Sequence, residues 1–406
     1  MSFDIALTGL NAASRHLDVT ANNIANVGTT GFKRSKAVFS DVFASSLTDA
    51  SNTQTGAGVK LAKINQQFSQ GNVTLTNNNL DLAINGDGFF TLSSVDQGLV
   101  YSRAGEFSLD KEGFVVNTDL NRLQIFPATT GGNFATGTLQ DLQLKNTAFP
   151  PKPSSTATVG LNLPSGAIAP AVAPFDPSNL DTFSHNSSMT VYDSQGASHS
   201  ASMYFVKDAA PNSWSQYLFI DGNAVGGANT LQFDGAGLLQ APANGLVTLP
   251  PYTPTNGAGP INLSIDFSDS TQYGNDFVVN NLAQDGFESG ILSGLAIDSN
   301  GVVSARYSNQ ASEQLGKIAL TGFNNPQGLQ QLGANTWAET FTAGDPRLGE
   351  PGTSNFGLIQ SSALESSNVD LSAELVEMVT AQRNYQANAQ VISTSDQITQ
   401  AILNIR

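Results

Sequence analysis

The sequence predicts a mainly β protein with a terminal α-helical coiled coil and with nested, discontinuous domains. Three observations support this fold class. Both ends of the chain carry apolar residues at alternating spacings of three and four, the middle carries Asp-x-x-Gly turns between alternating apolar residues, and prolines crowd into two internal segments. Spacings of three and four are typical of helices that pair along one narrow face, and alternation is typical of strands.

The C-terminal segment, residues 370–406, is predicted to form one long helix. It contains neither Gly nor Pro, and Asp370 is placed to cap the first turn. At ~1.5 Å per residue this helix would be about 55 Å long, and its polar faces carry few charges, so we expect it to have neighbours. The predicted seam consists of Leu371, Leu375, Met378, Tyr385, Ala389 and Ile392, followed after a slip in the spacing by Ile398 and Ile402.

The N-terminal segment, residues 1–27, is predicted to be a second helix with the same kind of seam. Gly28 follows it as a stop signal. Two such helices at opposite ends of the chain are most simply interpreted as packing on each other and on further copies, and a helical hairpin that closes the core of a monomer is the alternative. We expect both helices to be disordered in the free subunit, because each alone buries too little surface. The seam residues are Phe3, Leu10, Leu17, Ile24 and Val27.

Residues 28–75 and 358–369 are predicted to form an extended arm that connects the helices to the rest. The heptad-like spacing is lost there, and residues 28–75 carry five glycines and short alternating runs typical of one or two strands. Lys33, Arg34 and Lys36 form a small basic cluster. A solvated patch is the favoured interpretation of this cluster, and contact with an acidic neighbour is the alternative.

Residues 76–148 and 287–357 are predicted to form an inner β-domain built from two pieces. Four turns have Asp first and Gly fourth, the pattern of a type I turn followed by a left-handed residue, and a related turn runs from Asn85 to Gly88. Such turns between alternating apolar residues predict antiparallel sheets. The turn glycines are Gly88, Gly113, Gly196, Gly237 and Gly301.

Residues 149–286 are predicted to be a separate, inserted outer β-domain. Prolines crowd at 150–177 and again at 242–260, and the only basic residues between Pro150 and Asp285 are Lys152 and Lys207. Such a shift in composition is typical of a domain boundary.

The composition limits the classes of function. The formal net charge is −16, so the chain offers no electrostatic basis for binding nucleic acid or an anionic membrane. There is no cysteine, hence no disulfide and no thiolate chemistry. We find no signal peptide and no apolar run long enough for membrane insertion.

No catalytic, cofactor-binding or metal-binding site is predicted, and the chain is not expected to be an enzyme. His16 falls in the N-terminal helix, and His185 and His199 lie in strand-like sequence without a nearby carboxylate pattern. The Gly-rich turns fail the register of a calcium loop, and no phosphate-binding glycine motif opens a helix.

Several long segments resemble one family, the bacterial flagellar rod and hook proteins. LTGLNAASRHLDVTANNIANVGTTGFKRSK is similar to the opening signature of the family, and LESSNVDLSAELVEMVTAQRNYQANAQVISTSDQ is similar to its closing helix. LDLAINGDGFFTL, YSRAGEFSLDKEGFVVN and GKIALTGFNNPQGLQQLGANTWAET resemble its inner β-domain. The insert, with SSMTVYDSQGASHSASMYFVKDAAPNSWSQYLFIDG, resembles the outer domain of the hook members.

The resemblance implies a structural subunit of the hook, a self-assembling curved tube that acts as a universal joint and transmits torque from rod to filament. It implies a location in the extracellular flagellar hook, reached through the flagellar type III export apparatus without a cleaved signal peptide. The implied partners are further copies of the chain, the distal rod protein, the hook cap during assembly and a hook–filament junction protein. A distal rod protein of the same family is the alternative function, and a cell-wall hydrolase carried on an axial scaffold is a less favoured one.

Overall fold

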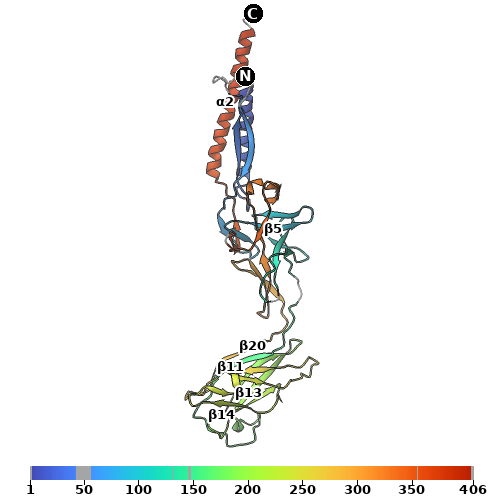
Figure 1. The fold of residues 1–406 in the computed structure, drawn as a ribbon, viewed down its shortest axis with the longest axis vertical. Helices are drawn as coiled ribbons and strands as arrows, with labels where there is room; N and C mark the ends of the chain where they lie inside the picture. The colour runs from blue at the N-terminus through green and yellow to red at the C-terminus, as the bar shows by residue number, and fades with distance from the viewer. Residues whose placement is uncertain (1, 43–55, 130, 145–147, 354, 404–406) are drawn as a thin grey trace. The chain divides into compact units, whose positions relative to one another are not determined.

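The computed structural model describes residues 2–42, 56–129, 131–144, 148–353 and 355–403. It is mainly β with one long helix at each end, which confirms the predicted fold class (Figure 1). The chain forms two compact units. We call them the terminal unit, residues 1–145, 295–305 and 313–406, and the insert unit, residues 146–294 and 306–312. The division into four parts made from the sequence is finer than this and stays a prediction.

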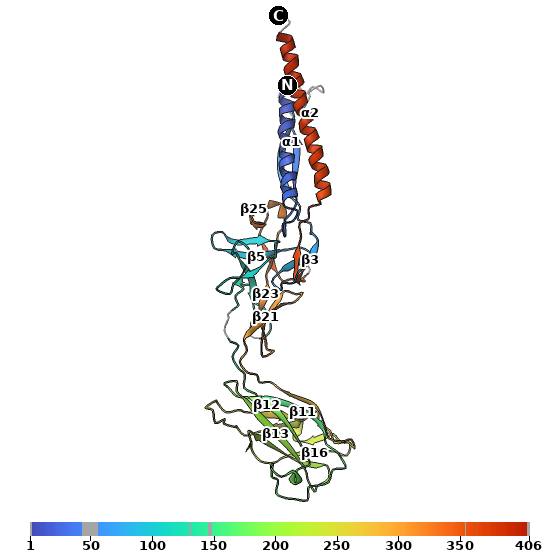
Figure 2. The same ribbon diagram turned by 180° about the vertical axis from the view of Figure 1, so that it is seen from behind.

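The two long helices of the terminal unit lie side by side and run antiparallel (Figures 1 and 2). α1 spans Ser2–Ala25 and α2 spans Leu371–Leu403. Asp370 caps α2 as the sequence predicts, because its carboxylate accepts hydrogen bonds from the backbone N–H groups of Ser372 and Ala373 at 2.9 and 3.2 Å. α2 is the longer helix by nine residues, and residues 396–401 at its far end are exposed on every face.

Strand pairs join the N-terminal and C-terminal parts of the terminal unit. The arm begins with an antiparallel hairpin of β1 (Ser35–Asp41) and β2 (Val59–Gln66), which packs against α1. β3 (Val73–Leu75) then pairs with β29 (Ala363–Glu365), and β4 (Leu82–Asn85) pairs with β28 (Leu358–Ser361). Segments nearly 300 positions apart in sequence therefore become neighbours in the fold.

In the described part of the chain, a 13-stranded sheet system forms the body of the terminal unit, and one end of each of its strands β21, β22 and β23 falls in residues assigned to the insert unit. Its centre is an aromatic cluster in which Phe89, Tyr101, Phe323 and Trp337 meet edge to face. Before the insert it contains β5 (Phe89–Ser94), β6 (Gly98–Ser102), β7 (Ser108–Leu109), β8 (Val115–Val116), β9 (Arg122–Pro127) and β10 (Gln140–Asp141). After the insert it contains β21 (Leu292–Ile297), β22 (Val302–Tyr307), β23 (Ser312–Ile318), β24 (Leu320–Gly322), β25 (Gln330–Gly333), β26 (Thr336–Ala338) and β27 (Arg347–Gly349), with the 3-10 turn η3 (Pro326–Gly328).

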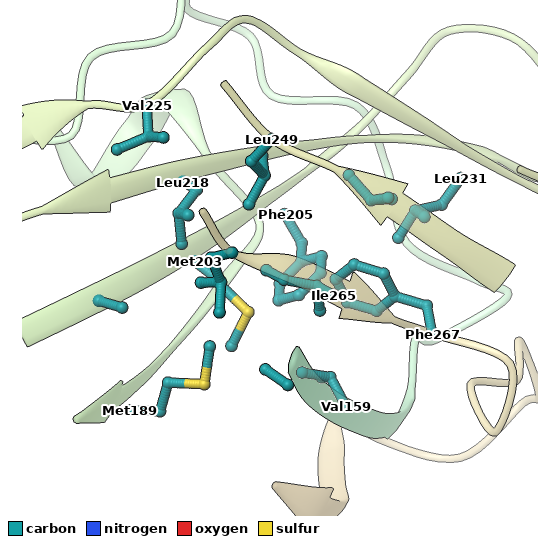
Figure 3. Close-up of a cluster of buried hydrophobic side chains, with 14 of the residues drawn as sticks. Val159, Met189, Met203, Phe205, Leu218, Val225, Leu231, Leu249, Ile265 and Phe267 are labelled. Atoms are coloured by element: carbon teal, nitrogen blue, oxygen red, sulfur yellow. The ribbon is translucent and has the colours of Figure 1, made fainter. Parts of the chain in front are cut away.

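The insert unit consists of two sheets around one apolar core (Figure 3). Met203, Phe205 and Trp214 from one sheet meet Val159 and Ile265 from the other. One sheet contains β12 (His185–Tyr192), β13 (Ser198–Lys207), β14 (Ser213–Ile220), β15 (Asn223–Ala224), β16 (Asn229–Phe233) and β17 (Leu239–Ala241). The other contains β11 (Thr156–Asn162), β18 (Leu246–Thr248), β19 (Ser264–Asp266) and β20 (Val278–Gln284), and η1 (Leu180–Thr182) and η2 (Ala243–Gly245) are short 3-10 turns.

The four Asp-x-x-Gly turns share one geometry. In each, the N–H of the glycine donates to the carbonyl of the aspartate at 3.0–3.1 Å, and the glycine has a φ of 76–84°. The Asp110 carboxylate also accepts from the backbone N–H of Phe114 at 2.8 Å, which closes the turn. Gly88 differs, with a φ of 118°. These positions favour glycine because L-residues, which carry a Cβ, rarely adopt a positive φ.

Gly113→Ala is expected to destabilise the terminal unit by about 3 kcal/mol. Backbone strain contributes roughly 1–2 kcal/mol, and a Cβ on Gly113 would also lie 2.2 Å from the carbonyl oxygen of Leu144. Gly98→Ala is the matched control, because Gly98 has a φ of 74° but nothing within 4 Å of the added carbon. Urea unfolding of both variants measures the difference, and equal losses would contradict the contribution of the close contact.

Candidate assembly surface

Small and polar residues make the contact between the two terminal helices. Three small residues that recur every seven positions along α1 are buried, namely Ala6, Ala13 and Thr20. Ala381 of α2 is buried as well. A Cβ added to Gly9 would come within 2.5 Å of the Asn388 side chain. The helices therefore approach closely through side chains that occupy little space.

The larger seam residues predicted from the sequence are not fully buried within the subunit. Those left exposed are Phe3, Val27, Leu371, Leu375, Tyr385 and Ile398. Those half-buried are Leu10, Leu17, Ile24, Met378, Ala389 and Ile392. The side chain of Ile402 lies outside the described residues. Further exposed apolar residues, which the seam rule missed because they lie off its spacing, are Ile5, Leu7, Val376, Val379 and Val391. The paired helices thus present an apolar surface to the solvent, which we call the helix surface.

A buried carboxylate, Glu374, holds the start of α2 to α1 and to the arm. The residue is 1% exposed. Its side chain accepts a hydrogen bond from Nδ2 of Asn23 at 3.1 Å and pairs with Nε of Arg34. Asn23 in turn accepts from the backbone N–H of Ser35 at 2.9 Å, which ties α1 to β1. This polar cluster therefore fixes the register of α1, α2 and β1.

A second buried carboxylate, Glu365, lies between two buried cations. Lys33 Nζ donates to Glu365 Oε1 at 2.6 Å, and Arg103 Nη1 donates to Glu365 Oε2 at 3.3 Å. The three side chains are at most 3% exposed. The backbone N–H of Gly71 also donates to Glu365 Oε1 at 2.8 Å, and Lys33 donates to the carbonyl of Ser69 at 2.8 Å. Burial lowers the pKa of Lys33, and the charge of Glu365 opposes that shift.

These contacts correct the favoured interpretation of the basic cluster at residues 33–36. A solvated patch was expected, but Lys33 is buried against Glu365 and Arg34 reaches Glu374. The alternative, contact with an acidic neighbour, holds for these two residues, and Lys36 is exposed. The partners lie more than 330 positions away, so no spacing in the sequence could identify them.

The carboxylate surroundings of His199 were also missed. Its ring lies between Asp193 and Asp221 in the insert unit. Among the described residues, no group of three or more His, Cys, Asp or Glu side chains has an arrangement that could hold a metal ion. In the part of the chain that the structure covers, no helix is both long enough and apolar enough to cross a membrane.

Comparison with protein-family models assigns four parts of the chain. Residues 3–33 match the model for the flagella basal body rod protein, and residues 83–165 match the flagellar hook protein FlgE/F/G D1 domain. Residues 162–287 match the flagellar basal body protein FlaE D2 domain, and residues 360–405 match the flagellar basal body rod FlgEFG protein C-terminal model. Together with paired terminal helices and an inserted β unit, these matches define an axial protein of the bacterial flagellum.

Full-length relatives narrow this class. The chain is 41% identical to the flagellar hook protein FlgE of Escherichia coli (strain K12) over 100% of both chains. It is 40% identical to the corresponding protein of Salmonella typhimurium (strain LT2), again over 100% of both, and 32% identical to that of Borreliella burgdorferi over 98% of both. The chain therefore belongs to the flagellar hook protein family and is a structural subunit of the hook.

A solved structure supports the fold. The crystal structure of Helicobacter pylori flagellar hook protein FlgE2 matches with a TM-score of 0.51 at 16% identity, covering 72% of this chain and 100% of that one.

Proposed function

We propose that copies of this chain assemble through the helix surface into a curved tube that transmits torque from the rod to the filament. The observation that carries the proposal is the set of large apolar side chains left exposed along both terminal helices, including Leu375 at 46% and Ile398 at 56% exposed. These side chains would be removed from water if the helices of further copies packed against them, and burial of apolar surface favours such association. The hook family to which the chain belongs supports the same assignment.

In the proposed tube the helices of neighbouring copies form the inner wall, and the predicted seam residues pack between copies. The end of α2 supports this arrangement, because residues 396–401 are exposed on all faces within one subunit. We expect the helix ends far from Glu374 to gain order only on assembly, since an unpaired helix of this composition buries too little surface. Hydrogen exchange in free and assembled protein tests this. Slow exchange of residues 396–403 in the free subunit would contradict it.

Further parts of the proposal rest on the family assignment. The proposed domains are a tube core (1–27 and 370–406), an arm (28–75 and 358–369), an inner β-domain (76–148 and 287–357) and an outer β-domain (149–286). The proposed partners besides copies of the chain are the distal rod protein, the hook cap, a hook–filament junction protein and the type III export apparatus. The proposed location is extracellular, reached without a cleaved signal peptide, and the proposed role involves no catalysis. A zymogram of the full chain on cell-wall substrate tests the last point, and a cleared zone would contradict it.

Bending requires contacts that exchange at low cost. We propose that, when the tube bends, the weakly charged faces of the β-sheet parts of one copy slide against those of neighbouring copies, while the terminal helices keep their packing. Charged residues are 12% of the chain, so few strong ion pairs are available to lock such faces. Electron microscopy of the assembled tube tests the proposal. Curved tubes whose inter-subunit β contacts differ around the bend are expected, and straight tubes would instead favour a rod protein.

Leu375→Asp is expected to abolish tube formation while leaving the subunit folded. Leu375 is 46% exposed in the subunit, so the change in subunit stability should stay within about 0.5 kcal/mol. Between copies the new carboxylate would be buried without a partner, which costs several kcal/mol. Val95→Asp is the matched control, because Val95 is 89% exposed in the β5–β6 turn, away from the helices. Sedimentation and electron microscopy measure assembly, and normal tubes from the Leu375 variant would exclude the helix surface as the contact.

A further inference from the structure

Three segments of the insert unit converge on His199, which lies on β13 and is 10% exposed. Nε2 of its ring lies 3.2 Å from Oδ2 of Asp193, in the turn that precedes β13. Nδ1 lies 2.5 Å from Oδ2 of Asp221, directly after β14. The ring of Tyr252 lies 6.3 Å from the imidazole, edge to face. The titratable groups that face His199 are therefore two carboxylates and one phenol.

This geometry requires a protonated imidazole. A neutral histidine has one N–H donor and one acceptor nitrogen, whereas an ionised carboxylate only accepts. With a carboxylate at each ring nitrogen, only the doubly protonated ring donates to both. Partial burial opposes the charged form, but the hydrogen bonds that the ring donates to Asp221 and Asp193, together with the charges of these carboxylates, outweigh it and raise the pKa of His199.

The carboxylate of Asp193 extends the cluster to a proline-rich segment, residues 250–260. The Asp193 side chain is fully buried, and its Oδ2 accepts a hydrogen bond from Nδ2 of Asn256 at 2.5 Å. Oδ1 accepts from the backbone N–H groups of Gln195 and Ala197 at 2.8 and 2.9 Å. Burial would raise the pKa of Asp193, but hydrogen bonds from Asn256, His199 and these backbone groups lower it to about 2.

We propose that protonated His199 is a pH-dependent clamp that holds segment 250–260 and the Asp221 turn to β13, and that the insert unit loosens when the surrounding solution becomes alkaline. When His199 loses one proton, one of its ring nitrogens no longer carries a hydrogen. The lone pair of that nitrogen then faces a carboxylate, and no hydrogen bond can form between them. Two carboxylates then lie near each other with no cation between them. The inference is independent of the proposed assembly, because every group involved belongs to the insert unit.

The direction of the pH effect follows from linkage. A histidine whose pKa is raised by folding contributes stability in full below its unfolded pKa of roughly 6.5, and that contribution is lost as the pH rises through the folded pKa. The lowered pKa of Asp193 sets the lower pH limit of the clamp. The stability that ionised Asp193 contributes is lost as the pH falls below its unfolded pKa of roughly 3.9 toward its folded pKa. The clamp is therefore closed at mildly acidic pH and opens as the pH rises through the folded pKa of His199.

Imidazole nitrogen NMR of the full chain tests the proposal without any change at the cluster. The chain has three histidines, so His16→Gln and His185→Gln variants assign the signals. His199 is expected to show two protonated nitrogens at pH 6 and a titration midpoint above 6.5. His185 is expected below 6.5, because burial lowers its pKa. A His199 midpoint at or below 6.5, or a single proton on its ring at pH 6, would overturn the clamp.

Unfolding in urea, followed by the fluorescence of Trp214 in a Trp337→Phe background, provides the second test. Trp214 is buried in the core of the insert unit. The unfolding midpoint of the parent is expected to fall between pH 6 and 9, and His199→Gln is expected to remove that fall. His185→Gln should retain it, since a lowered pKa acts in the opposite direction. An unchanged pH slope in the His199 variant rejects the proposal.

Discussion

Glu365→Ala is expected to lower the free energy of unfolding of the terminal unit by about 3–5 kcal/mol. The reason is that Lys33 and Arg103 are at most 3% exposed and both pair with this one carboxylate. Without it Lys33 loses its paired carboxylate, Arg103 keeps only its electrostatic interaction with Asp87, and the backbone N–H of Gly71 loses its acceptor. Removal of one partner from a buried charge group is far more destabilising than loss of a surface pair.

The two tryptophans allow the loss to be assigned to one unit. Trp337 lies in the aromatic cluster of the terminal unit and Trp214 in the core of the insert unit. In a Trp214→Phe background, urea unfolding reports the terminal unit alone. Glu112→Ala is the control, because its pair with Arg122 spans 3.7 Å and Glu112 is 55% exposed, so about 0–1 kcal/mol is expected. A loss below 1 kcal/mol for Glu365→Ala would show that the buried cluster contributes little.

Glu374→Ala is expected to raise the critical concentration for tube assembly roughly 30-fold, which corresponds to about 2 kcal/mol per subunit added. The change removes one of the two acceptors of the Asn23 amide nitrogen, which keeps the carbonyl of Ser35 at 2.8 Å, and it releases Arg34, which is 28% exposed and can reach water. Loss of a hydrogen bond to a charged group costs about 1.5–3 kcal/mol. The register of α1 against α2 would then depend on small side chains and on the half-exposed His16–Glu377 contact, and the helix surface would be held less firmly in one geometry.

Glu377→Ala, one turn further along α2, is the matched control. Glu377 is 48% exposed and lies 3.5 Å from His16, a surface contact of small expected effect. The critical concentration for tube assembly of the Glu377→Ala variant, measured by sedimentation of assembled tubes, should stay within about threefold of that of the parent. Equal effects of the two variants would show that α2 tolerates loss of either carboxylate and that Glu374 has no special role.

The features that could be predicted from the sequence depend on residues close together in it. The cap at Asp370 and the Asp110–Gly113 turn are closed by hydrogen bonds within four residues, so their residue types alone predict them. The helices were found from a repeat, which is also local. The family assignment rested on long motifs at both ends of the chain, and the full-length relatives agree with it.

The features that escaped prediction depend on the fold. Lys33 meets Glu365 only because β3 pairs with β29, and no spacing rule joins positions 332 apart. His199 gains Asp221 because β13 and β14 are neighbours. The seam rule did not identify which residues face the other helix of the same subunit. It gives weight to large apolar residues, whereas Gly9 allows close approach to Asn388 by its small size, and many of the large seam residues stay exposed or half-buried in the subunit.

The pairing of β3 with β29 and of β4 with β28 has a consequence for the order of folding. The terminal unit cannot close until residues 358–365 are present, because these supply the partner strands for residues 73–85. Nearly all of the insert unit, by contrast, is one continuous stretch, residues 146–294. In a chain that emerges from its N-terminus, the insert unit can fold before the strands that complete the terminal unit have emerged. Contacts between positions far apart in sequence are also slow to form. Closure of the terminal unit is therefore the late step that produces a subunit ready to join its neighbours.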